Sequence, residues 1–195
     1  MGTPDFAVAS LQALVEAGAN IVGVVTAPDK PAGRGMQLQQ SDVKKFALEH
    51  HLSVLQPASL KSPEFIEQLR ELKADIQIVV AFRMLPEIVW NMPPLGTINV
   101  HGSLLPKFRG AAPIHWAVIR GEKTTGVTTF QLKHVIDTGD ILLQKSVPIL
   151  PNATTGDLYN ELKIVGAELL IETLDQLAKG NLLPTPQQNI EDAAY

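Results

Sequence analysis

Short runs of apolar, β-branched residues alternate with helical patterns along this chain, and that alternation limits the possible folds more than any other feature. Alternation of this kind is typical of βαβ units, and strands that are nearly all apolar are typical of a sheet covered on both faces. We therefore predict an α/β fold with a doubly wound, mainly parallel sheet. The predicted strands are 21–26, 53–56, 76–82, 97–101, 127–132 and 141–149, and the predicted helices are 5–16, 42–49, 63–72, 112–120 and about 155–179.

The two ends of the chain depart from this alternation. Gly2-Thr3-Pro4 has the form of a turn between a strand and a helix, yet no strand precedes it. The sheet is therefore expected to lack its first strand in this chain. Residues 1–180 are expected to form one domain. The polar, proline-bearing residues 181–195 are expected to be a linker toward a C-terminal domain that the sequence does not contain.

Composition and charge exclude several kinds of site. The chain has no cysteine, which excludes disulfides, thiolate nucleophiles and thiolate zinc sites, and its histidines form no metal-binding motif, so no metal is expected. Apolar runs are shorter than the ~20 residues that cross a bilayer and no signal peptide is found, so we expect a cytoplasmic protein without a membrane partner. A net charge of −4 argues against a general nucleic-acid binder, although residues 101–123 are locally basic.

Two polar side chains mark the end of one predicted strand. In Thr97-Ile98-Asn99-Val100-His101 polar and apolar residues alternate, so Asn99 and His101 project from one face of the strand. The turn that follows places them at the sheet edge where open α/β folds bind ligands. On spacing alone, a pair of polar residues satisfied by loop backbone is an equally good interpretation.

A carboxylate lies between two later strands, in Asp137-Thr138-Gly139-Asp140. The plain interpretation is a turn in which glycine supplies an unusual backbone conformation. Asp-Thr-Gly is also the catalytic triplet of aspartic proteases, but those proteins are all-β and need a second carboxylate. We therefore set the protease interpretation aside and keep Asp137 as a possible acid or base in another reaction.

Several stretches together resemble the formyltransferases that use 10-formyltetrahydrofolate. The resemblance is carried by Asn99-Val100-His101-Gly102-Ser103-Leu104-Leu105-Pro106, Gly126-Val127-Thr128-Thr129 and Ile136-Asp137-Thr138-Gly139-Asp140. It covers about residues 1–180 and implies the Rossmann-like formyltransferase fold. The wider stretches 1–6, 28–35 and 109–114 narrow the resemblance to members whose acceptor is the amino group of methionyl initiator tRNA, which serves translation initiation.

This resemblance implies catalytic roles for Asn99, His101 and Asp137. Formyl transfer to an amine passes through a tetrahedral carbon that bears an oxyanion, so the site needs donors aimed at that oxygen. The amine must lose a proton and the folate nitrogen must gain one. Asn99 and His101 are expected to supply donors, and Asp137 is expected to relay the proton. This chemistry requires no metal.

The resemblance also implies where the folate co-substrate lies. We expect it along the segment that follows the strand of His101, with its pteridine ring between two apolar segments. The residues involved are Ser103, Leu104, Leu105 and Pro106 for the first part and Phe82, Met84, Leu85, Ile136 and Asp140 for the second. This chain has Phe82-Arg83 where many relatives carry Tyr-Gly.

Residues 27–40 are predicted to form a long loop, and they match the family's insertion that enters the tRNA acceptor end. Arg34 is expected to contact tRNA phosphates or bases, with Lys30, Lys44 and Lys45 adding positive charge. The competing interpretation is a surface loop with scattered cations.

Two alternative functions stay open at this point. One is formyl transfer to a small amine such as a sugar nucleotide or glycinamide ribonucleotide. The other is a folate- or RNA-binding remnant without turnover, because the family's first strand and C-terminal domain are missing from these residues. Charged initiator tRNA and the folate are the expected partners, and the chain is expected to act as a monomer.

Overall fold

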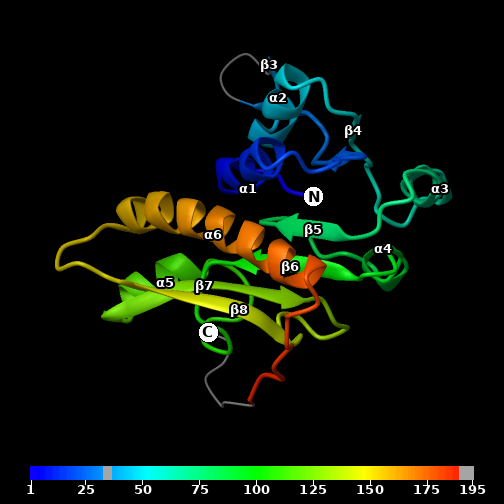
Figure 1. Cartoon of the computed structure of the whole chain (residues 1–195). Helices are drawn as coiled ribbons and strands as arrows, with labels where there is room; N and C mark the ends of the chain where they lie inside the picture. Colours follow the sequence, from blue (N-terminus) through cyan, green and yellow to red (C-terminus); the bar gives the residue numbers. More distant parts are fainter. Residues whose placement is uncertain (33–36, 189–195) are drawn as a thin grey trace. The chain divides into compact units, whose positions relative to one another are not determined.

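The computed structural model describes residues 1–32 and 37–188, and the chain divides into two compact units, Met1–Thr97 and Ile98–Tyr195 (Figure 1). The elements of the first unit are α1 (Asp5–Glu16), β1 (Val24–Val25), β2 (Lys30–Ala32), β3 (Gln37–Gln39), α2 (Asp42–Glu49), β4 (Val54–Leu55), α3 (Pro63–Glu71), β5 (Gln77–Val80) and α4 (Glu87–Trp90). The second unit is built from β6 (Thr97–His101), α5 (Pro113–Ile119), β7 (Thr124–Gln131), β8 (Ile141–Pro148) and α6 (Thr155–Ala178).

Strands of the first unit pair in parallel except β2 and β3, which form an antiparallel pair. β1 pairs with β4, with Val24 opposite Val54. Met1 and Gly2 are bonded on both sides, because Gly2 N donates to Val25 O at 3.1 Å and Val80 N donates to Met1 O at 2.9 Å. These two residues therefore hold the sheet position of the first strand, which the sequence predicts to be missing.

Two helices of the first unit, α2 and α3, begin at serine caps. Ser41 Oγ accepts from Lys44 N at 3.0 Å at the start of α2, and Ser62 Oγ accepts from Phe65 N at 3.3 Å at the start of α3. Each hydroxyl satisfies an N–H that the first helical turn leaves unpaired. The predicted long loop is more ordered than expected, since β2 and β3 form an antiparallel pair within it.

The second unit is an antiparallel meander of β6, β7 and β8 covered by α6. The connection between β7 and β8, residues 132–140, is too short for the crossover of a dozen or more residues that parallel neighbours need. The α/β class is confirmed, and this meander departs from parallel pairing, as does the β2–β3 pair.

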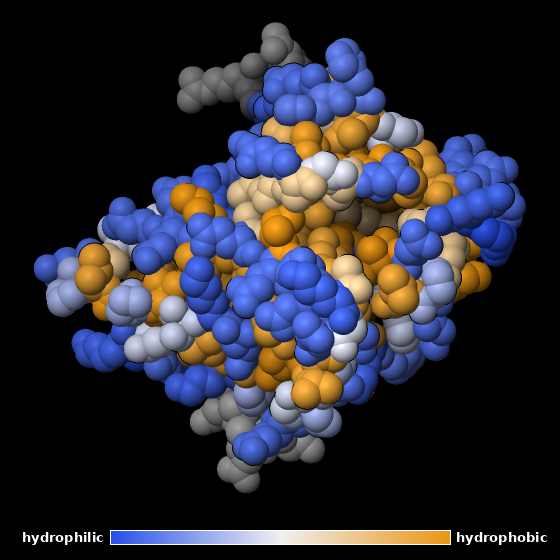
Figure 2. Space-filling view, in the orientation of Figure 1, coloured by the Kyte–Doolittle hydropathy of each residue, from blue (hydrophilic) through white to orange (hydrophobic). Residues whose placement is uncertain are grey.

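α6 packs on β7 and β8 through one face (Figure 1). Its apolar side chains Leu158, Leu162, Leu169 and Leu170 are buried, as are Val127 and Phe130 on β7. The outward side carries exposed acids such as Glu161 and Glu168, and Figure 2 shows hydrophilic residues over this helix. A capping box begins α6, because Thr154 Oγ1 accepts from Asp157 N at 3.1 Å and Asp157 Oδ2 accepts from Thr154 N at 2.9 Å.

Within the described ranges, no helix combines the length and the apolar character that a membrane crossing requires.

Candidate active site

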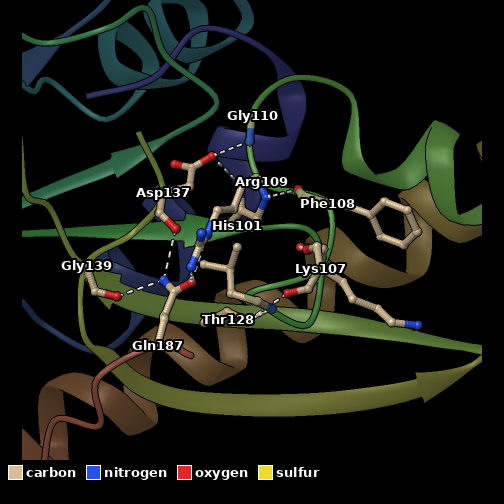
Figure 3. Close-up of polar contacts among 11 residues, drawn as sticks. His101, Lys107, Phe108, Arg109, Gly110, Thr128, Asp137, Gly139 and Gln187 are labelled. Atoms are coloured by element: carbon tan, nitrogen blue, oxygen red, sulfur yellow. Dashed lines mark hydrogen bonds and ion pairs between the residues drawn. The ribbon is translucent and has the colours of Figure 1, made fainter. Parts of the chain in front are cut away.

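His101 and Asp137 lie side by side in the second unit although 36 positions separate them in the sequence. His101 is the last residue of β6, and Asp137 lies in the loop between β7 and β8. His101 Nδ1 is 3.7 Å from Asp137 Oδ2, and both side chains are buried (Figure 3). At that separation the two groups form an ion pair when the imidazole is protonated.

A backbone carbonyl fixes which nitrogen of His101 carries the proton. His101 Nε2 lies 2.8 Å from Phe108 O. A carbonyl oxygen only accepts, so Nε2 is the donor and the neutral ring presents its Nδ1 lone pair toward Asp137. His101 can then donate from Nδ1 only after it has taken up a proton.

The loop 107–112 also orients Asp137. Gly110 N donates to Asp137 Oδ2 at 2.7 Å, while Phe108 of the same loop accepts from His101. Phe108 and Gly110 have φ values of 57° and 88°, so the loop doubles back sharply. One short segment therefore sets the positions of both the imidazole and the carboxylate.

Asn99 occupies the same face of β6 as His101, two residues earlier, and it is half-buried. It lies opposite Phe130 of β7. Within the described part of the chain its amide makes no hydrogen bond to protein. Its donors and its acceptor are therefore free to meet a ligand.

The predicted folate segment is held by side chains from β7 and β8. Thr128 Oγ1 donates to Ser103 O at 2.7 Å and accepts from Leu105 N at 3.1 Å. Gln144 Nε2 donates to Leu105 O at 2.9 Å. Ser103 and Leu105 are buried, whereas Leu104 and Pro106 are partly exposed and remain available to a ligand.

The other predicted folate residues fall in different units. Phe82, Met84 and Leu85 follow β5 in the first unit, where Met84 is 69% exposed and Leu85 is buried. Ile136 and Asp140 belong to the second unit, where Ile136 is 54% exposed and Asp140 Oδ1 accepts from Lys133 Nζ at 2.7 Å.

Arg83 is engaged within the first unit. Its guanidinium donates to the carbonyl oxygens of Pro57 and Ala58 and lies 5.5 Å from the centre of the Phe82 ring. Arg83 therefore ties the segment after β5 to the segment after β4.

The four residues predicted to contact tRNA have different surroundings. Arg34 lies outside the described residues. Lys30 is exposed on β2, and Lys45 is exposed beside Asp42. Lys44 is different, because its Nζ is 2.6 Å from Asp29 Oδ2 and its side chain is only 15% exposed.

Lys44 and Asp29 form an anchor at the base of the predicted loop. Gln56 Nε2 also donates to Asp29, at 2.8 Å. The hydrogen bond from Lys44, and then that from Gln56, lower the pKa of Asp29 below its usual value. We interpret Lys44 as a residue that fixes the base of the loop.

Position 139 requires glycine because the loop that carries Asp137 passes very close to the end of β7 there. A Cβ atom at this position would lie 1.5 Å from Gln131 O and 3.2 Å from Phe130 Cδ2. Replacing Gly139 with alanine is expected to displace the loop that carries Asp137 and to lower the free energy of unfolding by about 1–3 kcal/mol. Chemical denaturation measures this loss. Gly156→Ala in α6 is the matched control, because only Thr154 Oγ1, at 3.7 Å, approaches its new Cβ; an equal loss in both variants contradicts the steric argument.

Sequence reasoning from the residues missed the backbone groups of Phe108 and Gly110. Both contacts use main-chain atoms, Phe108 O and Gly110 N, so the pattern of side chains in the sequence does not predict them. One signal in the sequence could have pointed to this loop: Gly110 lies in the stretch 109–114, which is among those that carry the family resemblance. No group of three or more His, Asp or Glu in the described ranges is arranged to hold a metal ion.

The α/β fold with its antiparallel meander is that of formyltransferases. Residues 1–174 match the family described as "Formyl transferase", and the chain belongs to that family. Over 190 residues it is 58% identical to "Methionyl-tRNA formyltransferase" of Bacteroides fragilis, in an alignment that covers 97% of this chain and 59% of the relative. The chain thus spans about three fifths of the length of that curated relative.

Solved structures agree with this family. Phosphoribosylglycinamide formyltransferase from Bacillus halodurans superposes with a TM-score of 0.74 at 25% identity, covering 90% of this chain and 91% of that one. HypX from Aquifex aeolicus, solved in complex with tetrahydrofolic acid, superposes with a TM-score of 0.59 at 26% identity, covering 73% of this chain and 25% of that one.

Proposed function

We propose that this chain transfers the formyl group of 10-formyltetrahydrofolate to the amino group of methionyl initiator tRNA, for translation initiation. The observation that carries the proposal is 58% identity over 97% of the chain to a methionyl-tRNA formyltransferase. Identity to the phosphoribosylglycinamide enzyme is only 25%, so a small amine acceptor is not favoured. The buried His101–Asp137 pair argues against a remnant without turnover, because a binding module has no need of a proton acceptor.

The proposed chemistry assigns one task to each of three side chains. As the amine attacks the formyl carbon, a carbon–nitrogen bond forms and the carbonyl oxygen becomes an oxyanion. Asn99 donates from its free amide to that oxygen. Protonated His101 is the second donor, through Nδ1, and Asp137 stabilises the imidazolium.

Proton balance assigns the rest of the reaction to Asp137 and His101. The attacking amine becomes positively charged and loses a proton to the Asp137 carboxylate, directly or through a water. The departing folate nitrogen must receive a proton as its bond to the formyl carbon breaks. Protonated His101 gives its Nδ1 proton to that nitrogen, and Asp137 then returns the proton it took from the amine to His101, directly or through a water, so no net proton is gained or lost.

An acceptor panel tests this function. The intact protein is incubated with 10-formyltetrahydrofolate and, separately, with methionyl initiator tRNA, glycinamide ribonucleotide or an amino-sugar nucleotide. Formyl-methionine is expected after mild hydrolysis of the tRNA, with no product from the small amines. Formylation of a small amine at equal or higher kcat/KM contradicts the proposal, and so does the absence of any formyl-methionine.

We also propose that residues 27–40 contact the tRNA, with Arg34, Lys30 and Lys45 facing it and Lys44 holding the base of the loop. Arg34→Ala is expected to lower kcat/KM for the charged tRNA and leave the Kd of folate unchanged. If Arg34 contacts one phosphate, the negative slope of log kcat/KM against log salt becomes shallower by about 0.7–0.9 in this variant. Salt titration of the rate measures this slope.

Lys61→Ala is the control for that variant, since Lys61 is an exposed cation outside the predicted loop. It is expected to keep both the rate and the salt slope. Equal losses for tRNA and folate in Arg34→Ala contradict the assignment of the loop to tRNA.

A further inference from the structure

The chain returns to the candidate site after α6. Thr185 exchanges two backbone hydrogen bonds with Ile141, the first residue of β8, and both are 2.8 Å long. Residues 184–188, here called the strap, are thereby fixed beside the loop that carries Asp137. The sequence predicts a linker in this region and gives it no part in the site.

Gln187 of the strap uses its whole side-chain amide for contacts around Asp137. Its Nε2 donates to Asp137 O at 2.9 Å and to Gly139 O at 2.7 Å. Its Oε1 accepts from Arg109 Nε at 3.1 Å and from Arg109 Nη2 at 2.8 Å (Figure 3). A glutamine amide has two N–H donors, so both are used.

These contacts join the two loops that orient the catalytic pair. The donors of Gln187 hold the 137–139 turn, and its acceptor holds Arg109, the neighbour of both Phe108 and Gly110. Asp137 has a φ of 51°, a left-handed conformation that is costly for a residue with a side chain and needs support from its surroundings. Two bonds to carbonyls at this turn supply such support.

We propose that Gln187 is a positioning residue for formyl transfer: by holding the 137–139 turn, it keeps the Asp137 carboxylate beside His101 and in its hydrogen bond with Gly110 N. This inference rests on the proposed function. Arg109 is its partner, since the guanidinium holds the amide with its N–H groups toward the 137–139 turn. A purely structural role for the strap would affect stability and leave the chemical step unchanged.

The first test is the kinetics of Gln187→Leu in the intact protein. Leucine has similar size and no polar atoms. We expect kcat to fall by about 10- to 100-fold, the cost of a small misplacement of a catalytic group, with KM for both substrates and the melting temperature little changed. Gln187→Glu keeps an acceptor for Arg109 but has no donor for the carbonyls, and a comparable loss of kcat is expected.

Gln188→Leu is the matched control. Gln188 is exposed and reaches Arg109 through its carbonyl oxygen, which the substitution retains. This variant is expected to keep the kcat of the unsubstituted protein. An unchanged kcat in Gln187→Leu overturns the inference, and so does an equal loss in the two leucine variants.

A second measurement does not depend on the acceptor. Gly110 N donates to Asp137 Oδ2, so hydrogen exchange at the Gly110 amide reports where the carboxylate lies. Gln187→Leu is expected to speed this exchange by about tenfold or more, with no change in Gln188→Leu. If the unsubstituted protein formylates no charged tRNA, the proposed function fails and this exchange still decides the positioning role. Equal exchange in all three proteins overturns that role even where formylation is active.

Discussion

Replacing Asp137 with asparagine is expected to lower the single-turnover rate of formyl transfer by about 10²- to 10⁴-fold, the usual contribution of a positioned acid or base. Asparagine has the same shape and can still accept from Gly110 N, so the loop is expected to keep its conformation. What it lacks is the negative charge that stabilises protonated His101, and the ability to take a proton from the amine.

The measurement is rapid-quench formylation with enzyme in excess over charged tRNA, which isolates the chemical step. Asp175→Asn on α6 is the control, because that carboxylate is exposed and its ion pair, with Lys179 at 2.7 Å, lies on the surface of the helix. A rate for Asp137→Asn within threefold of the unsubstituted protein is incompatible with Asp137 as the proton acceptor.

Asn99→Ala is expected to lower the same rate by about 10²- to 10³-fold, the typical cost of losing one oxyanion donor. The amide makes no protein hydrogen bond within the described ranges, so its removal breaks no internal contact. Stability is therefore expected to change little. The loss is expected in kcat, since the bond to the oxygen strengthens only as negative charge develops.

Thermal melting and single-turnover rates of Asn99→Ala separate these two effects. Asn160→Ala, at an exposed position of α6, is the control for a change from asparagine to alanine. If Asn99→Ala formylates at the unsubstituted rate, Asn99 is not the oxyanion donor. A large drop in melting temperature with an unchanged rate assigns Asn99 to the fold.

Local signals in the sequence predict much of the fold. The caps at Ser41, Ser62 and Thr154 are visible in sequence because each bond joins residues three positions apart. The helix bounds they set agree with the structure to within one or two residues. The antiparallel meander of β6 to β8 was not predicted, because apolar runs reveal strands but do not reveal their direction.

Some residues of the candidate site were likewise predictable from the sequence, and others were not. Alternation along β6 places Asn99 and His101 on one face, and only the family resemblance links them to Asp137. The carbonyl of Phe108, the amide of Gly110 and the strap residue Gln187 are invisible to side-chain patterns, since their contacts run through backbone groups or span 50 positions. Lys44 has a charge that suggests nucleic acid, but Asp29 is its partner in the structure.

A double-mutant cycle on His101 and Asp137 tests most directly whether the two side chains act as one proton-transferring unit. Single-turnover formylation is measured for His101→Ala, Asp137→Ala and the variant with both changes. If the pair acts as a unit, the double variant is no more than about tenfold slower than the slower single variant. Losses that multiply in the double variant mean that the two residues act independently, which contradicts the mechanism proposed for this chain.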